Sequence, residues 1–182
     1  KISEESNSWI TYSVSSDDQN IFFITWIGDG ITYSQIITKQ GAFVGTNKTL
    51  DISTPLRNLY FPKLTNAING TMYFAYYGYR RNDLDVMIQK FDLDFNPIGS
   101  SVKVADDYCS AFQTKPINKY NYSGESIVVW EDKRDGTINL YGQVLDKQDD
   151  PVSENIMIHD SSDYKWAENP YIISDNEGNF II

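Results

Sequence analysis

The chain has 182 residues, a formal net charge of −10, and a composition that is 41% hydrophobic and 14% aromatic. This composition is typical of a folded domain and excludes a disordered segment. Basic residues adjoin one another only at Arg80-Arg81 and Lys133-Arg134, which disfavours a nucleic-acid partner. No apolar run reaches the roughly twenty residues that span a bilayer, so we expect no membrane span.

In chain order, the first predicted unit covers residues 9–54. Its strand at 21–26 is rich in β-branched and aromatic residues, and a tight hairpin follows around Gly28-Asp29-Gly30. The second unit, 55–107, is predicted to have strands at 60–66, 71–79, 84–92 and 100–105. The third unit, 108–161, is predicted to have strands at 114–120, 126–131, 138–146 and 154–159. Residues 162–182 form a partial fourth unit, and no segment shows helical periodicity.

These units repeat with a period of 54 residues, which is marked by Pro62, Pro116 and Pro170. Trp26 lies only 50 residues before Tyr76, so we expect the hairpin of the first unit to be four residues shorter. Four short strands per repeat predict an all-β chain of antiparallel blades, stacked as a β-propeller or part of one. A β-solenoid or a two-sheet sandwich is the alternative.

The number of units indicates that this one repeat domain is a fragment of a longer chain. Closed propellers have about four to eight blades, whereas the sequence holds three units and a part that stops within a strand pair at Ile182. An open strand edge invites strand addition. We therefore expect self-assembly or a protein partner at such an edge.

The stretch from Val128 to Gln143 is the most motif-like part of the sequence. It has a strand ending in Trp130, a turn with Asp132 and Arg134, and a second strand that ends in Tyr-Gly-Gln. It resembles the Trp-x-Asp-x-Arg…Tyr-x-Gln repeat of secreted and cell-surface β-propeller-like proteins. The resemblance implies an architecture and no particular function. The structural repeat positions are Trp26, Tyr76, Trp130, Arg80, Arg134, Pro62, Pro116 and Pro170.

The two repeated arginines have two interpretations. Arginines that face a propeller axis can bind a carboxylate, as in sialidases, but a third arginine and the other sialidase motifs are missing. We favour a turn in each unit, stabilised by pairs between Asp132 and Arg134 and between Asp83 and Arg80.

Three N-glycosylation sequons begin at Asn47, Asn69 and Asn121, at predicted hairpins or strand edges. They indicate a secreted glycoprotein with an extracellular or cell-surface location, although Asn is also common in turns. Cys109 is the single cysteine. We expect a buried thiol there, and pairing with another chain is the less favoured alternative.

Groups that could carry chemistry are few. A glycosidase needs two carboxylates about 5 to 10 Å apart, and no acidic pair recurs between units. The available carboxylates are Asp85, Glu131, Asp132 and Asp135. His159 is the only histidine, which excludes a His-based metal cluster. Turns at 132–139 and 146–150 could hold Ca²⁺, although solvated turns are the simpler interpretation. We therefore expect no catalytic residue and no cofactor.

Aromatic side chains raise the possibility of glycan binding, because their faces stack on sugar rings. The candidates are Trp9, Trp166 and Tyr79, with Tyr77 and Tyr164 as further ones. The predicted function is a non-catalytic extracellular scaffold or assembly subunit with strand-edge contacts. The alternative is a carbohydrate-binding, lectin-like propeller, and the third possibility is a glycosidase-like enzyme.

Overall fold

The computed structural model describes residues 11–17, 21–28, 30–52, 57–80, 83–106, 111–159, 168–175 and 177–182. The elements found in these residues are all β-strands. Within the same ranges there is no helix of the length and apolarity that a membrane crossing requires.

Three sheets have four antiparallel strands each, ordered in space as they are in the chain. The first sheet comprises β1 (Thr11–Ser16), β2 (Phe22–Gly28), β3 (Ile31–Ile37) and β4 (Phe43–Thr49). The second comprises β5 (Arg57–Ile68), β6 (Thr71–Arg80), β7 (Asp83–Asp92) and β8 (Pro97–Lys103). The third comprises β9 (Gln113–Tyr120), β10 (Ser126–Asp132), β11 (Asn139–Leu145) and β12 (Ile156–His159). A two-stranded sheet follows, with β13 (Ile173–Ser174) and β14 (Phe180–Ile181).

The strands predicted for the second and third units are confirmed, and each end lies within three residues of its predicted position. The shorter hairpin of the first unit is confirmed as well. Trp26 pairs with Tyr33, seven residues later, whereas Tyr76 pairs with Met87 and Trp130 with Tyr141, eleven residues later in both cases.

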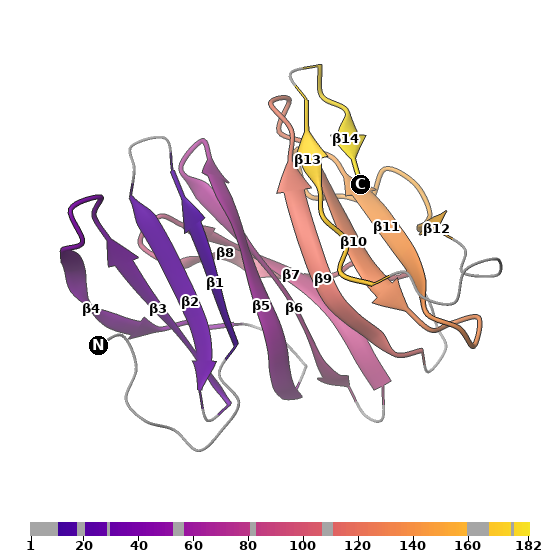
Figure 1. Ribbon diagram of the computed structural model, residues 1–182, viewed down its shortest axis with the longest axis horizontal. Helices are drawn as coiled ribbons and strands as arrows, with labels where there is room; N and C mark the ends of the chain where they lie inside the picture. The colour runs from indigo at the N-terminus through magenta and orange to yellow at the C-terminus, as the bar shows by residue number, and fades with distance from the viewer. Residues whose placement is uncertain are drawn as a thin grey trace.

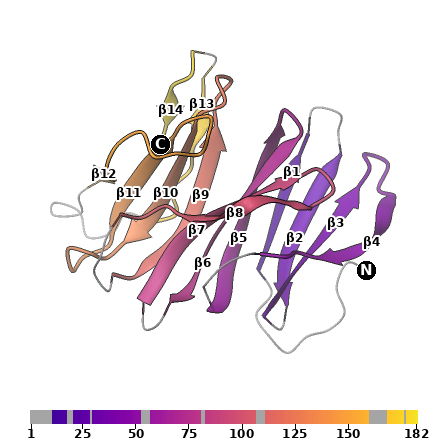
Figure 2. The same ribbon diagram turned by 180° about the vertical axis from the view of Figure 1, so that it is seen from behind.

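The sheets stand side by side with their first strands together. Figures 1 and 2 show β1, β5 and β9 adjacent to one another, with β4, β8 and β12 toward the outside. One four-stranded sheet cannot cover both of its faces, and stacking such sheets around their first strands does so. The fold is all-β and β-propeller-like. It has three separate four-stranded sheets, and is not the two-sheet sandwich that was the alternative.

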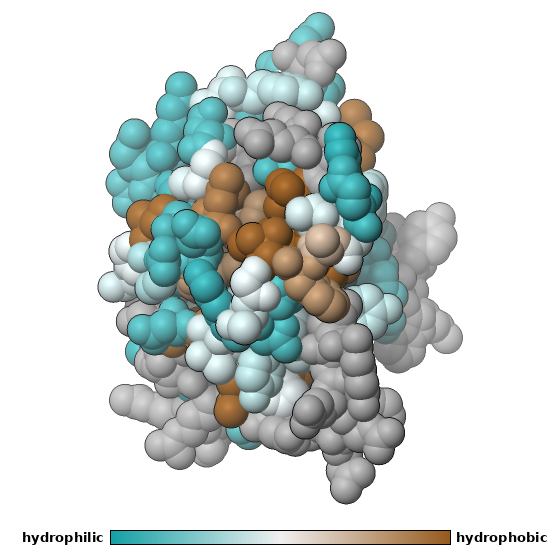
Figure 3. All heavy atoms as spheres, turned by 90° about the vertical axis from the view of Figure 1, so that its left-hand side faces the viewer, coloured by the Kyte–Doolittle hydropathy of each residue, from teal (hydrophilic) through white to brown (hydrophobic). Residues whose placement is uncertain are grey.

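Each sheet has two faces, which we name by what they contact. The leading face carries the position of Trp26, Tyr76 and Trp130; in the second and third sheets it packs on the sheet before it. The trailing face is the opposite one. Tyr76 and Trp130 are fully buried at these contacts, so the recurring aromatic position forms the core between sheets. Figure 3 looks onto the side formed by the first sheet, where hydrophobic side chains gather among polar ones.

The side chains of the recurring glutamines, on the third strand of each sheet, donate hydrogen bonds to backbone carbonyls of the fourth strand or of the segment that leads into it. Gln35 Nε2 donates to Val44 O at 3.1 Å, Gln89 Nε2 to Gly99 O at 3.1 Å, and Gln143 Nε2 to Ser153 O at 2.8 Å. The pairing register shifts at Gln35 and at Gln89, which leaves carbonyl groups without a ladder partner there. A buried amide satisfies these carbonyls, so the glutamines are structural.

The recurring prolines lie on or before the first strands. Pro62 and Pro116 are buried where the register of β5 and of β9 shifts, and Pro170 precedes β13. Proline has no N–H to donate, so it fits a bulge and not a regular ladder position.

Candidate functional site

Glu131 is a buried carboxylate at one end of the third sheet. This end, the lower one in Figure 1, is where the first strands begin and the second strands end; we call it the lower end. Glu131 is the second-last residue of β10 and pairs with Thr114 on β9. Its side chain is 4% exposed. A buried carboxylate is costly unless it is paired and hydrogen-bonded, so its partners matter.

Three donors surround the Glu131 carboxylate. Lys115 Nζ lies 3.0 Å from Oε1, the backbone N–H of Asn169 donates to Oε1 at 3.2 Å, and Thr114 Oγ1 donates to Oε2 at 3.4 Å. An ionised carboxylate only accepts hydrogen bonds, so this set of donors suits the charged form. Two of the donors lie on β9 and the third lies in the segment before β13, so Glu131 contacts both segments.

Glu168 supplies a second carboxylate next to the first. Its Oε2 lies 3.7 Å from Lys115 Nζ, which also contacts Glu131. The two carboxylate oxygens are therefore at most 6.7 Å apart, which is the sum of the 3.7 Å and 3.0 Å distances. Glu168 is 41% exposed, whereas Glu131 is buried. The upper bound of 6.7 Å overlaps the range of about 5 to 9.5 Å between the two carboxyl groups of glycosidases, and the surroundings of Glu131 and Glu168 differ.

The backbone is unusual at the two residues that bring these groups together. Lys115 and Asn169 have φ values of 50° and 56°, and each directly precedes a proline, Pro116 or Pro170. A positive φ is uncommon for residues other than glycine, and proline pushes the residue before it toward extended backbone. Such strain costs about 1–3 kcal/mol and clusters at functional sites.

Three tyrosines of the second sheet lie beside this cluster. Tyr60 stacks on Tyr77 at 5.4 Å between ring centroids and meets Tyr79 edge-on at 6.2 Å. Tyr60 and Tyr79 are partly exposed, whereas Tyr77 is buried. Burial, together with the nearby Tyr60 and Glu131, raises the pKa of Tyr77 to about 12. The influence of Glu131 on Tyr77 means that the tyrosines and the carboxylate share one region.

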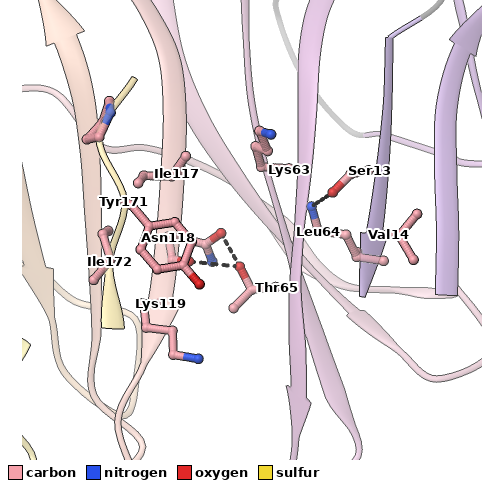
Figure 4. A pocket seen from close by; sticks show the side chains of 11 residues that line it. Ser13, Val14, Lys63, Leu64, Thr65, Ile117, Asn118, Lys119, Tyr171 and Ile172 are labelled. Carbon is pink, nitrogen blue, oxygen red and sulfur yellow. Dashed lines mark hydrogen bonds between the residues drawn. The ribbon is translucent and has the colours of Figure 1, made fainter. Parts of the chain in front are cut away.

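A groove runs between the first strands of the sheets (Figure 4). Its volume is about 270 Å³, and β1, β5, β9 and the segment 170–172 line it. Across it, the Leu64 N–H donates to Ser13 Oγ at 2.9 Å, and Thr65 Oγ1 donates to Asn118. Pro170 lines the groove and follows Asn169, so the Glu131 cluster lies beside it.

The other buried carboxylates serve the framework. Asp132 accepts hydrogen bonds from Trp130 Nε1 and from Arg134 Nη2, both at 2.8 Å. This Asp132–Arg134 contact is the turn pair that we expected. In the second sheet the expected partner of Arg80 is corrected: Arg80 lies 3.6 Å from Asp85, a buried carboxylate that Lys103 also contacts at 3.0 Å. Asp83 instead accepts the N–H of Leu84, because it starts β7.

The predicted glycosylation sites have unlike surroundings. Asn47 on β4 and Asn69 in the hairpin between β5 and β6 are exposed. Asn121 is buried, and its Nδ2 donates to Glu125 Oε2 and to Gly178 O, each at 2.9 Å. A glycan replaces one of the two hydrogens on that nitrogen and would break at least one of these hydrogen bonds, so the fold leaves Asn47 and Asn69 as the accessible acceptors.

Several predicted residues lie outside the described ranges: Trp9, Cys109, Tyr164 and Trp166. Tyr79 is described, and its place beside Tyr60 suits the predicted glycan stacking, which stays a prediction.

The turns predicted as possible Ca²⁺ sites have other contacts. Asp149 accepts from Tyr73 Oη at 2.6 Å and pairs with Lys90 at 3.1 Å, and Asp146 accepts two backbone N–H groups of its own turn. Among the residues that the structure describes, no three acidic, His or Cys side chains are grouped as metal ligands would be.

Of this cluster, only Glu131 was among the carboxylates expected from the sequence; Thr114, Lys115, Glu168 and Asn169 were not predicted. A signal for them was present in the repeat. A 54-residue shift superimposes Tyr60, Thr114 and Glu168, and places Tyr77 on Glu131. Aromatic residues in one unit thus become polar or acidic in the next, at two positions that face each other.

No protein-family model matches the chain. No curated protein matches it either. Solved structures with a similar fold are known. An α-L-arabinanase from Penicillium chrysogenum complexed with arabinobiose has a TM-score of 0.67 at 14% identity, over 93% of this chain and 57% of that one. An endo-arabinase from Bacteroides thetaiotaomicron has a TM-score of 0.55 at 14% identity, over 92% of this chain and 66% of that one.

An α-L-arabinofuranosidase from Fusarium graminearum, in complex with an iminosugar inhibitor, has a TM-score of 0.53 at 13% identity. It matches over 88% of this chain and 47% of its own. This chain thus spans about half to two thirds of the length of the three structures. At such low identity the likeness establishes the fold alone.

The prediction of a non-catalytic scaffold is wrong, and so is the expectation that the chain is not an enzyme. The finding that overturns both is that the three similar structures are an arabinanase, an endo-arabinase and an arabinofuranosidase. The error arose because the regular repeat positions are packing positions, which say nothing of the residues between them. The findings favour the alternative, a carbohydrate-binding propeller, and the third possibility, a glycosidase-like enzyme, over the scaffold.

Proposed function

We propose that this chain is part of a carbohydrate-active β-propeller that hydrolyses glycosidic bonds at the lower end of its third sheet. The observation that carries the proposal is the buried Glu131 carboxylate, which shares Lys115 with the half-exposed Glu168. The similar structures support the substrate class, an arabinose-containing oligosaccharide.

Each acidic side chain has a distinct role in this proposal. Glu131 accepts hydrogen bonds from three donors, so it acts as the nucleophile or the base. Glu168, which is 41% exposed, donates a proton to the leaving oxygen. Lys115 touches both and is a positioning residue: it neutralises Glu131 and fixes the separation of the pair.

Glycan binding without hydrolysis is the second candidate function. The cluster of Tyr60, Tyr77 and Tyr79 favours it, because two partly exposed rings next to a polar groove suit stacking on a sugar. Secretion and glycosylation at Asn47 and Asn69 fit either candidate, because such glycans are extracellular.

One experiment distinguishes hydrolysis from binding without hydrolysis. It uses the protein expressed from the whole gene that encodes these residues. The assay measures reducing ends released from arabino-oligosaccharides, with calorimetry for binding. We expect turnover that falls at least 1,000-fold in Glu131→Gln, while binding persists. Glu177→Gln, on the exposed hairpin between β13 and β14, is the control. Binding without turnover in the unmodified protein would favour the lectin-like alternative. The absence of both binding and turnover would refute both candidate functions.

A further inference from the structure

Among the described residues, the side chains that line the groove between the first strands include two basic ones and no acidic one. The basic residues are Lys63 on β5 and Lys119 on β9. The whole sequence has 25 acidic residues against 15 basic ones, so the charge of this lining is opposite to that of the molecule. In Figure 4 the ring of Tyr171, which is 78% exposed, lies between the two lysine side chains.

Neither lysine is paired with a carboxylate in the part of the chain that the structure describes. There, the ion pairs with Asp or Glu are formed by Arg80, Lys90, Lys103, Lys115 and Arg134. An ammonium group donates hydrogen bonds and accepts none. Lys63 and Lys119 therefore bring to the groove two positive charges that no carboxylate of the described residues neutralises.

The uncharged side chains of the groove add a further donor. Thr65 Oγ1 donates to the backbone O and to Oδ1 of Asn118, and Asn118 Nδ2 has no partner among the described residues. Ser13 Oγ already accepts the N–H of Leu64. The groove thus offers N–H donors from three side chains, whereas the side-chain oxygens of Ser13 and Asn118 are already used. Such a lining fits an ionised carboxylate, which only accepts hydrogen bonds.

The groove leads to the Glu131 cluster. Lys119 lies on the same strand as Lys115 and four residues further on, which is roughly 13 Å along β9 at about 3.3 Å per residue. Tyr171 follows two residues after Asn169, whose N–H donates to Glu131. A glycan that extends from Glu131 along the first strands would therefore place further sugar units over Tyr171 and beside the lysines.

We propose that this groove binds an acidic sugar unit, a uronic acid, whose carboxylate pairs with Lys63 and Lys119 while its ring stacks on Tyr171. This inference rests on the proposed function and narrows its substrate class: the oligosaccharide that Glu131 cleaves carries a carboxylate on a nearby unit. A neutral sugar would leave both ammonium groups without a counter-ion, so the groove discriminates by charge.

Calorimetry with two matched ligands tests this binding without requiring turnover. The ligands are a trimer of galacturonic acid and the neutral trimer made by reducing its carboxyl groups, and the protein is the product of the whole gene. At low salt we expect the acidic trimer to bind at least tenfold more tightly. The double variant Lys63→Gln, Lys119→Gln should lose this preference. The control variant Lys39→Gln, Lys147→Gln removes the same charge at exposed turns and should keep it.

Three results would overturn the inference. One is that the unmodified protein binds both trimers equally or binds neither. Another is a preference that survives in the Lys63→Gln, Lys119→Gln variant, because the carboxylate then binds elsewhere. The third is displacement of the acidic trimer by inorganic phosphate at equal concentration, which identifies a site for small anions.

The proposed function fails in a different way, because its assay uses neutral arabino-oligosaccharides. A preference for the acidic trimer without any hydrolysis would refute the role of Glu131 and leave the carboxylate site in place. Hydrolysis without that preference would refute the carboxylate site alone.

Discussion

In the second sheet, the paired ends of β5 and β6 carry Tyr60 and Tyr77, which stack on each other. In the third sheet, the corresponding ends of β9 and β10 carry Thr114 and Glu131, which lie beside Lys115. The two pairs occupy equivalent positions in their sheets, but the second sheet has aromatic side chains there and the third has polar and charged ones. The comparison teaches that the repeat specifies packing at the positions that recur, whereas the candidate site lies at positions that differ between units.

The largest effect on stability is expected at a recurring position. Trp130→Ala empties a fully buried site between the second and third sheets, so the free energy of unfolding should fall by about 3–5 kcal/mol. Urea denaturation measures it. Thr114→Val, at the lower end of the same sheet, should cost less than half as much. An equal loss would show that the lower end is as much a part of the framework as the core.

A smaller loss is expected when the site loses its cation. Lys115→Met leaves Glu131 buried without its ion-pair partner and should lower the free energy of unfolding by about 1–3 kcal/mol. Lys115 is one-third exposed, so solvent screening keeps the loss in this range. Adding Glu131→Gln to Lys115→Met should restore most of it in a double-mutant cycle. Additive effects would mean that the two residues do not interact.

The next largest loss of stability is expected for a recurring glutamine, Gln89. Gln89→Ala removes the amide that donates to Gly99 O and to Lys90 O, so about 1–2 kcal/mol should be lost. Amide hydrogen exchange should become faster in β8 and remain unchanged in β5. Uniform acceleration across the sheet would contradict a local role for Gln89.

The smallest effect at neutral pH is expected for Tyr77→Phe. The folded-state pKa of Tyr77 is about 12, above its ordinary value of 10.0, so the neutral ring is favoured by folding. Its contribution to stability is complete below pH 10 and is lost as the pH rises through 12. Urea unfolding at pH 7 and pH 11 should show a smaller alkaline loss in Tyr77→Phe than in the unmodified protein. An identical loss in both would assign the alkaline sensitivity to other groups.

The sequence predicted the fold to within a few residues because the fold depends on what recurs. Alternating apolar strands, the 54-residue period and the Trp26, Tyr76 and Trp130 position all follow from packing between sheets. Glu131 was visible as one acidic residue among several. Its partner Glu168 lies 37 residues further on, in a different unit, and the two meet only because the sheets stack around their first strands. The proximity of Glu131 and Glu168 therefore could not be predicted from the residues around either one.

The central claim is that Glu131 performs chemistry at a position where the second sheet has only a packing tyrosine. The most direct test compares arabino-oligosaccharide hydrolysis by the unmodified protein, by Glu131→Gln and by Tyr77→Phe, with binding measured in parallel. The account predicts that Glu131→Gln loses turnover at least 1,000-fold while binding and stability persist. It also predicts that Tyr77→Phe changes turnover less than tenfold. Unchanged turnover in Glu131→Gln would contradict the account.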